Sequence, residues 1–383
     1  MASSFSPVRR AWLVAAAGVA AWPSRVVHAA AEAPAQAPLV PLVAGLRVTT
    51  AVHEAGVGDY ESSKTLLARL TAPTAGWRIE LKASKRGARF GSPPRPVQSQ
   101  RLQADADLAQ AGTYRPRFED DAEEDYPGTT ALGLSTRLLA ALRAGRSALR
   151  IVEDPAAFMP GTVDPLGLGP LFAASEVVLS GELQRASGAA PRALLVCGRM
   201  LPLPVLRAQG ELRLRTGQPV PVQLDVLDDL RNPLALGWQI GGHRLAVVRI
   251  DWPQPDDAPR LTAELTSQRR IVLPGLYFDF RSAVLRPDSA AGLALLLQAV
   301  WAAPTGAAMR LEGHTDSIGE ADANQALSLA RAQSVRAALV QRDASLGQRL
   351  QAMGLGATRP VDDNATLEGR ARNRRVELVL PRT

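Results

Sequence analysis

Short runs of alternating apolar and polar residues recur through the last third of the chain, and this pattern constrains the fold more than any other feature. Side chains of a strand point alternately to its two faces, so these runs predict strands that each bury one face. Helical patterns and turn residues separate the runs. The predicted strands are residues 276–280, 309–313, 350–354 and 374–380.

The first helical pattern lies between the first two strands. Pro287 stands where a helix can begin, because its missing N–H is not needed there, and Pro304 with Gly306 ends the pattern. The apolar residues recur at i, i+3, i+4, i+7 and i+8, which indicates one buried stripe. These residues are Leu293, Leu296, Leu297, Val300 and Trp301.

A second helix is predicted from Asp322 to about Gln341, because Asp322 is followed by Gln325 at the spacing of a capping pair. A short third helix is predicted from Asn364. Together with the strands, these helices give a β-α-β-α-β-β order. The predicted fold class is α+β, with a mixed sheet in the C-terminal part of the chain.

Polar residues cluster where the second strand leads into the second helix. Asp316 follows the strand, and Asn324, Ser328 and Arg331 fall within about 60° of arc on the helix. Spacing alone leaves two interpretations of Asp316 and Arg331. They form a structural ion pair, or they bind a ligand that carries both an ammonium and a carboxylate.

Three sequence strings bear on this choice. They are YFDF at 277–280, EGHTDSIGEADANQALSLAR at 312–331 and GRARNRRVEL at 369–378. In order and spacing, the three resemble the OmpA-like peptidoglycan-binding domain, over residues 270–383. The resemblance favours the binding interpretation.

The resemblance also implies which residues bind. Asp316 and Arg331 match the acid and the arginine that hold the diaminopimelate of the peptidoglycan stem peptide. Further residues are implied to shape the pocket: Asp279, Asn324, Leu327 and Arg375. Strand alternation puts Arg374 and Arg375 on opposite faces, and we predict that Arg375 faces the pocket. The expected function is non-enzymatic, non-covalent binding of peptidoglycan that anchors or links the cell envelope.

The N-terminus resembles an export signal. Arg9 and Arg10 precede an apolar run, residues 11–22, and small residues follow, which predicts a signal peptide over residues 1–31. Either the general secretory or the twin-arginine route fits this pattern. Residues 32–38 are predicted to be a linker, and we expect no membrane span in the mature chain. The expected location is the periplasm, with peptidoglycan, and peripheral contact with the outer membrane is left open.

Residues 39–265 are predicted to form one or more β-rich domains of unknown function. Short apolar runs with frequent Gly and Pro indicate many short strands, and one helix is predicted at 134–144. We expect this region to bind an envelope protein. The alternative is an exported cell-wall enzyme that the C-terminal domain tethers. Asp228 and Asp229 are its candidate acids, although a turn is the preferred interpretation of that segment.

The composition argues against other function classes. The net charge is +7, but the basic residues are scattered and not interleaved with aromatic ones, so no nucleic-acid partner is predicted. The four histidines have no metal-ligand spacing, and His314 is predicted to be structural. The single cysteine, Cys197, is predicted to be a small buried residue of a strand. No metal and no cofactor are expected.

Overall fold

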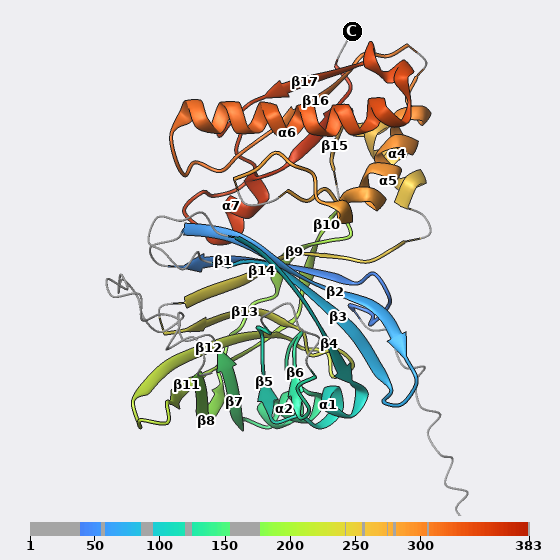
Figure 1. Cartoon of the computed structure of the whole chain (residues 1–383). Helices are drawn as coiled ribbons and strands as arrows, with labels where there is room; N and C mark the ends of the chain where they lie inside the picture. Colours follow the sequence, from blue (N-terminus) through green and yellow to red (C-terminus); the bar gives the residue numbers. More distant parts are fainter. Residues whose placement is uncertain are drawn as a thin grey trace, which may run out of the picture. The chain divides into compact units, whose positions relative to one another are not determined.

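The computed structural model describes most of the chain after residue 38 (Figure 1). The predicted signal peptide (1–31) and linker (32–38) lie outside the described residues. The described ranges are 39–54, 58–85, 95–118, 125–153, 177–241, 243–254, 257–273, 275–278, 281–304 and 306–381.

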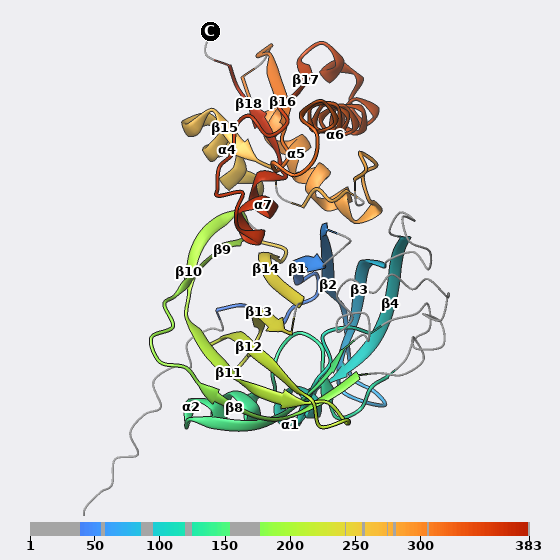
Figure 2. The same cartoon turned by 90° about the vertical axis from the view of Figure 1, so that its left-hand side faces the viewer.

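The β-rich region is built on one strongly curved 14-stranded sheet (Figures 1 and 2). Its order is β4-β3-β2-β1-β14-β13-β12-β11-β8-β7-β5-β6, and β9 joins β14 in parallel and pairs with β10. The strands are β1 (Arg47–Glu54), β2 (Gly58–Leu70), β3 (Gly76–Lys85), β4 (Arg95–Ala104), β5 (Thr113–Tyr114), β6 (Thr129–Thr130), β7 (Arg146–Glu153), β8 (Val177–Arg185), β9 (Arg192–Val196), β10 (Arg199–Leu203), β11 (Val205–Arg213), β12 (Pro219–Leu227), β13 (Ala235–Ile240) and β14 (His243–Asp251). The prediction of a β-rich N-terminal region is confirmed.

Local sequence explains the helices of this region. Helix α2 (Thr136–Arg143) begins after Ser135, whose hydroxyl accepts a hydrogen bond from Leu138 N, and it buries three leucines. Gly145 follows with φ of 127°, as a left-handed residue after a helix requires. The helix predicted at 134–144 is therefore confirmed. A shorter helix, α1 (Asp105–Gln110), precedes it.

Cys197 differs from its prediction. It lies in the turn between β9 and β10, with φ of 45°, and is half-buried. The apolar run before it forms β9, but the reversal at Cys197 and Gly198 ends the strand. Burial raises the pKa of the Cys197 thiol to about 11, so the thiolate is disfavoured at neutral pH.

The C-terminal domain combines helices with a four-stranded mixed sheet, as predicted. The sheet order is β15-β18-β16-β17, with β16 and β17 parallel and the other neighbours antiparallel. Figure 2 shows helix α6 nearly end-on beside this sheet. The elements are α4 (Asp257–Gln268), β15 (Arg270–Val272), the 3₁₀ turn η2 (Pro287–Ser289), α5 (Ala290–Ala302), β16 (Met309–Gly313), α6 (Ala321–Arg342), η3 (Ala344–Gly347), β17 (Leu350–Gly354), α7 (Leu367–Asn373) and β18 (Val376–Val379).

Three predictions for this domain are wrong. The first strand is β15, and of the predicted strand 276–280 the described residues 276–278 form none, since Tyr277 N donates to the Ser289 hydroxyl. Trp301 is 56% exposed and donates to Asp343 at 2.8 Å, so it lies outside the buried stripe. Asp322 does not cap α6, which follows Glu320 without a side-chain cap.

The β-rich region ends earlier than predicted. Residues up to 265 were assigned to it, but α4 packs Leu261 and Leu265 into the same core as α5 and β18. A small apolar cluster joins α7 to the neighbouring strands β1 and β14: Ala51, Ala246, Val248, Leu367 and Ala371. No helix of the described residues is long and apolar enough to cross a membrane.

Candidate functional site

Two glycines bring helix α6 close to the ends of β16 and β17. A Cβ on Gly313 would lie 2.0 Å from Ser328 O, and a Cβ on Gly354 would lie 2.6 Å from Leu329 N. Only residues without a side chain permit this approach. It places the loop that carries Asp316 beside the middle of α6, where Arg331 lies.

Asp316 is held by the loop in which it lies. Its side chain is buried, and Oδ1 accepts from Ile318 N at 3.0 Å. The amide of Asn324 donates to the carbonyls of Ile318 at 3.0 Å and of Asp316 at 3.4 Å. Asn324 thus fixes the shape of the loop, and Asp316 enters the site with its orientation set.

Arg331 is buried, and its guanidinium makes no ion pair with the part of the chain that the structure describes. Its Nε donates to Ser282 O at 3.0 Å, and the guanidinium carbon lies 5.1 Å from the centre of the Phe278 ring. Burial lowers the pKa of Arg331 to about 10, and Glu61 opposes this shift most strongly among neighbouring charges. Among the described residues, no carboxylate makes a salt bridge with Arg331. The structural ion pair between Asp316 and Arg331 is therefore not formed.

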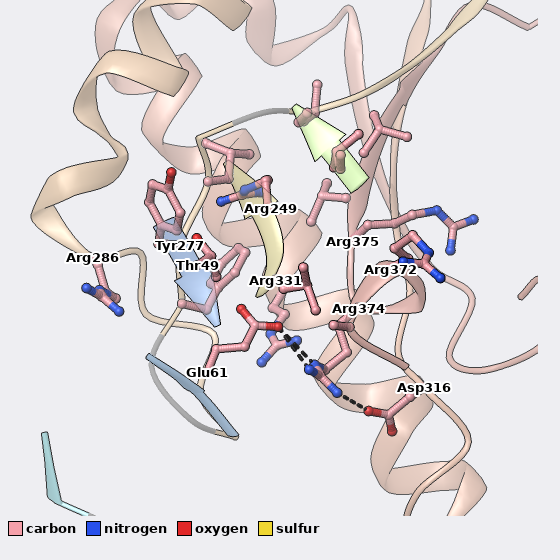
Figure 3. A pocket seen from close by; sticks show the side chains of 18 of the residues that line it. Thr49, Glu61, Arg249, Tyr277, Arg286, Asp316, Arg331, Arg372, Arg374 and Arg375 are labelled. Carbon is pink, nitrogen blue, oxygen red and sulfur yellow. Dashed lines mark hydrogen bonds and ion pairs between the residues drawn. The ribbon is translucent and has the colours of Figure 1, made fainter. Parts of the chain in front are cut away.

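Arg374 pairs with Asp316 instead. Its Nη1 donates to Asp316 Oδ2 at 2.6 Å, and its Nη2 donates to Glu61 Oε1 of β2 at 2.9 Å (Figure 3). Burial alone would lower the pKa of Arg374, but Glu61 and Asp316 hold it above its ordinary value. Of Arg374 and Arg375, only Arg375 was predicted to face the pocket, but both line it. Arg374 caps the end of α7 and precedes β18, so strand alternation does not apply to it.

A cavity of about 830 Å³ surrounds these groups. Of the residues predicted for the site, Asp316, Asn324, Leu327, Arg331 and Arg375 line it, and Asp279 lies outside the described residues. Residues that the sequence did not indicate also line it. They include Glu61, Arg249, Tyr277 and Arg374. Tyr277 and Arg374 belong to the other two strings, Glu61 and Arg249 belong to none, and only the fold brings them together with Asp316 and Arg331.

Two further predicted residues have structural contacts. Arg375 is mainly buried, with its Nε donating to Glu377 at 2.6 Å, although it also contacts the cavity. Ser328, placed with Arg331 on one predicted polar stripe, is fully buried and accepts from Gly356 N at 2.9 Å. Ser328 therefore fixes the loop after β17 and does not line the cavity.

One group of metal-ligating side chains comes together in the described residues. Ligand atoms of Glu312, His314 and Glu377 lie within 4.8 Å of one another. Burial lowers the pKa of His314 to about 4, so the imidazole is neutral at neutral pH. Both carboxylates, however, already form salt bridges with guanidinium groups, those of Arg270, Arg310, Arg359 and Arg375. A site with four such cations around two acids disfavours a divalent ion.

The fold and the site define a class of protein: a small α+β binding domain whose pocket presents a carboxylate and a buried guanidinium. The OmpA family model matches residues 277–374. Outer membrane protein A of Bordetella avium is 33% identical over 168 residues, which cover 40% of this chain and 83% of that protein. The chain belongs to the OmpA family.

Other relatives match the C-terminal domain only. Outer membrane porin F of Pseudomonas aeruginosa is 45% identical over 100 residues, 26% of this chain and 28% of the relative. Peptidoglycan-binding protein ArfA of Mycobacterium bovis is 43% identical over 74 residues, 19% of this chain and 22% of the relative. The chain thus spans less than a third of the length of these relatives.

Proposed function

We propose that this protein binds peptidoglycan non-covalently through its C-terminal domain and anchors or links the cell envelope. One observation supports this proposal most strongly. Arg331 is buried, it makes no salt bridge with a described carboxylate, and it lines the same cavity as Asp316. Its relative ArfA is named as a peptidoglycan-binding protein. That name and the geometry of the pocket support the same proposal.

The ligand we propose is the diaminopimelate residue of the stem peptide, whose side chain ends in a carbon with an ammonium and a carboxyl group. The planar fork of Arg331 can hold a carboxylate through two parallel hydrogen bonds. A carboxylate has about four acceptor positions, so Asp316 can accept from the ammonium while it keeps its bonds to Ile318 and Arg374. Each charge-assisted bond contributes about 1.5 to 3 kcal/mol. Many such peptides on one sacculus strengthen retention further.

The test uses the purified chain and two soluble muropeptides, one with diaminopimelate and one with lysine at the third position of the stem. Wild type is expected to bind the first more tightly in calorimetric titration, because lysine lacks the terminal carboxylate. Arg331→Gln should lose this preference, whereas Asp316→Asn should weaken the binding of both muropeptides, because both carry the terminal ammonium. Asp322→Asn is the matched control, since Asp322 is exposed on the first turn of α6. Equal binding of both muropeptides by wild type would overturn the diaminopimelate assignment.

We propose a non-enzymatic role in the periplasm, with the β-rich region binding an envelope protein. The two candidate catalytic acids support this. Asp228 forms a salt bridge with Arg143 at 2.6 Å, and Asp229 forms one with Arg231 at 3.0 Å. Both lie in the turn after β12, which was the preferred interpretation. Release of soluble muropeptides from sacculi by the purified chain would contradict this role.

A further inference from the structure

We propose that Glu61 of the β-rich region acts as an internal pseudo-ligand, which competes with the ligand carboxylate for the guanidinium groups of the binding pocket. This inference rests on the proposed function and adds regulation to it. It makes peptidoglycan binding depend on how the β-rich region is held against the C-terminal domain.

The position of Glu61 carries the inference. Its carboxylate accepts two hydrogen bonds from Arg374, from Nη2 at 2.9 Å and from Nε at 3.3 Å. Figure 3 shows Arg374 between Glu61 and Asp316, with the guanidinium of Arg331 beside Glu61. Among neighbouring carboxylates, Glu61 also has the largest effect on the pKa of Arg331, larger than that of Asp316. The carboxylate with the largest effect on the pKa of Arg331 therefore comes from β2.

A ligand carboxylate would meet Glu61 at this place. Arg331 is the group that the proposed ligand carboxylate needs, and two carboxylates near one guanidinium repel each other in a buried site. The side chain of Glu61 is 39% exposed, so water can solvate its carboxylate when it leaves the pocket. The ligand must displace Glu61, so its apparent affinity is lower when fewer molecules have Glu61 away from the pocket.

Contacts beside the pocket keep Glu61 in place. Tyr277 of the C-terminal domain donates to Asp251 at the end of β14 at 3.4 Å. The guanidinium carbon of Arg47 on β1 lies 4.1 Å from the centre of the Tyr277 ring, and Arg47 also forms a salt bridge with Asp288 at 2.9 Å. These contacts hold β1 and β14 on the C-terminal domain, and β2 pairs with β1 along its length.

The experiment measures affinity for the soluble diaminopimelate muropeptide with the full chain. Glu61→Gln keeps the shape of the side chain and removes its charge, so affinity is expected to rise about three- to tenfold. Glu61→Asp keeps the charge on a shorter side chain and should give a smaller rise. Glu182→Gln is the control, because Glu182 is an exposed acid of β8 that pairs with Arg146. Thermal unfolding of each variant shows that the fold is kept.

The outcomes separate this inference from the proposed function. If wild type binds the muropeptide and Glu61→Gln binds equally or more weakly, Glu61 does not compete, and the inference is overturned. Weaker binding would make Glu61 an acceptor for the ligand ammonium. If neither wild type nor Glu61→Gln binds, the proposed function itself fails. A gain in Glu61→Gln that Asp316→Asn abolishes in the double variant supports both.

Discussion

At the scale of single residues, we expect the buried guanidinium of Arg331 to set the strength of ligand binding. Arg331→Lys keeps the charge but loses the planar fork and the stacking on Phe278. We expect muropeptide affinity to fall at least tenfold, equivalent to about 1.4 kcal/mol, with little change in the unfolding temperature. Arg342→Lys at the end of the same helix is the control. Equal affinities in titration calorimetry would remove Arg331 from the site.

His314 predicts a pH dependence of stability. Burial is the main cause that lowers its folded-state pKa to about 4, below the value near 6.5 in the unfolded chain. The unfolded state therefore binds more protons than the folded state between these two pH values. The contribution of His314 to the free energy of unfolding is present above pH 6.5 and is lost as the pH falls toward 4. Its size is at most about 3 kcal/mol.

His314→Phe tests this dependence. Neither imidazole nitrogen has a hydrogen-bond partner among the described residues, so a ring of similar size replaces the imidazole without loss of such a bond. Urea unfolding of the variant should show a shallower fall in stability from pH 6.5 to 4 than wild type does. His53→Gln, at an exposed position, should keep the wild-type slope. Parallel curves for wild type and His314→Phe would refute the assignment.

Residue patterns predicted part of this site. Local spacing placed Asp316 at a strand end and Arg331 on a helix face, and the resemblance to the OmpA-like domain named them as binding residues. Arg374 could not, because its role depends on where α7 ends, and the alternation rule was applied to a residue that precedes the strand. Glu61 carries no local signal, since it reaches Arg374 across 313 residues of sequence.

At the scale of elements, the close approach of α6 to β16 depends on Gly313. A methyl group there would lie 2.0 Å from the backbone oxygen of Ser328, so Gly313→Ala must push α6 away. We expect a loss of stability of about 1 to 3 kcal/mol and weaker muropeptide binding, because Arg331 moves with the helix. Gly347→Ala, whose Cβ would lie 3.9 Å from Val340, should change neither. Chemical denaturation and titration measure the two effects.

Elements with strong patterns were located well, and short ones were not. Strands β16 and β17 have the bounds predicted from alternation, since both bury one face against α6. Strand β15 spans three residues at the edge of the sheet, too few to show a period. The alternation of Leu276 and Phe278 resembled that of a strand, but the backbone of Tyr277 bonds to Ser289 of η2, and its ring lies against Arg47 of the β-rich region.

At the scale of the whole molecule, the sequence divided the chain into regions but gave no sign of their contact. That contact depends on charges from distant strands. Glu368 of α7 forms salt bridges with Arg192 of β9 at 2.9 Å and with Arg244 of β14 at 3.2 Å. It lies outside the residues that line the cavity, so it influences the pocket only through the position of the β-rich region.

Glu368→Lys is therefore expected to loosen the contact between the regions and to raise muropeptide affinity about two- to fivefold, in the same direction as Glu61→Gln. Hydrogen exchange should become faster in α7 and in the start of β14, which shows that the contact has opened. Because the substitution also adds positive charge, Glu182→Lys serves as the charge-matched control on an exposed acid far from α7 in sequence. If exchange becomes faster and affinity stays at the wild-type value, the β-rich region does not restrict the pocket, and competition by Glu61 is refuted.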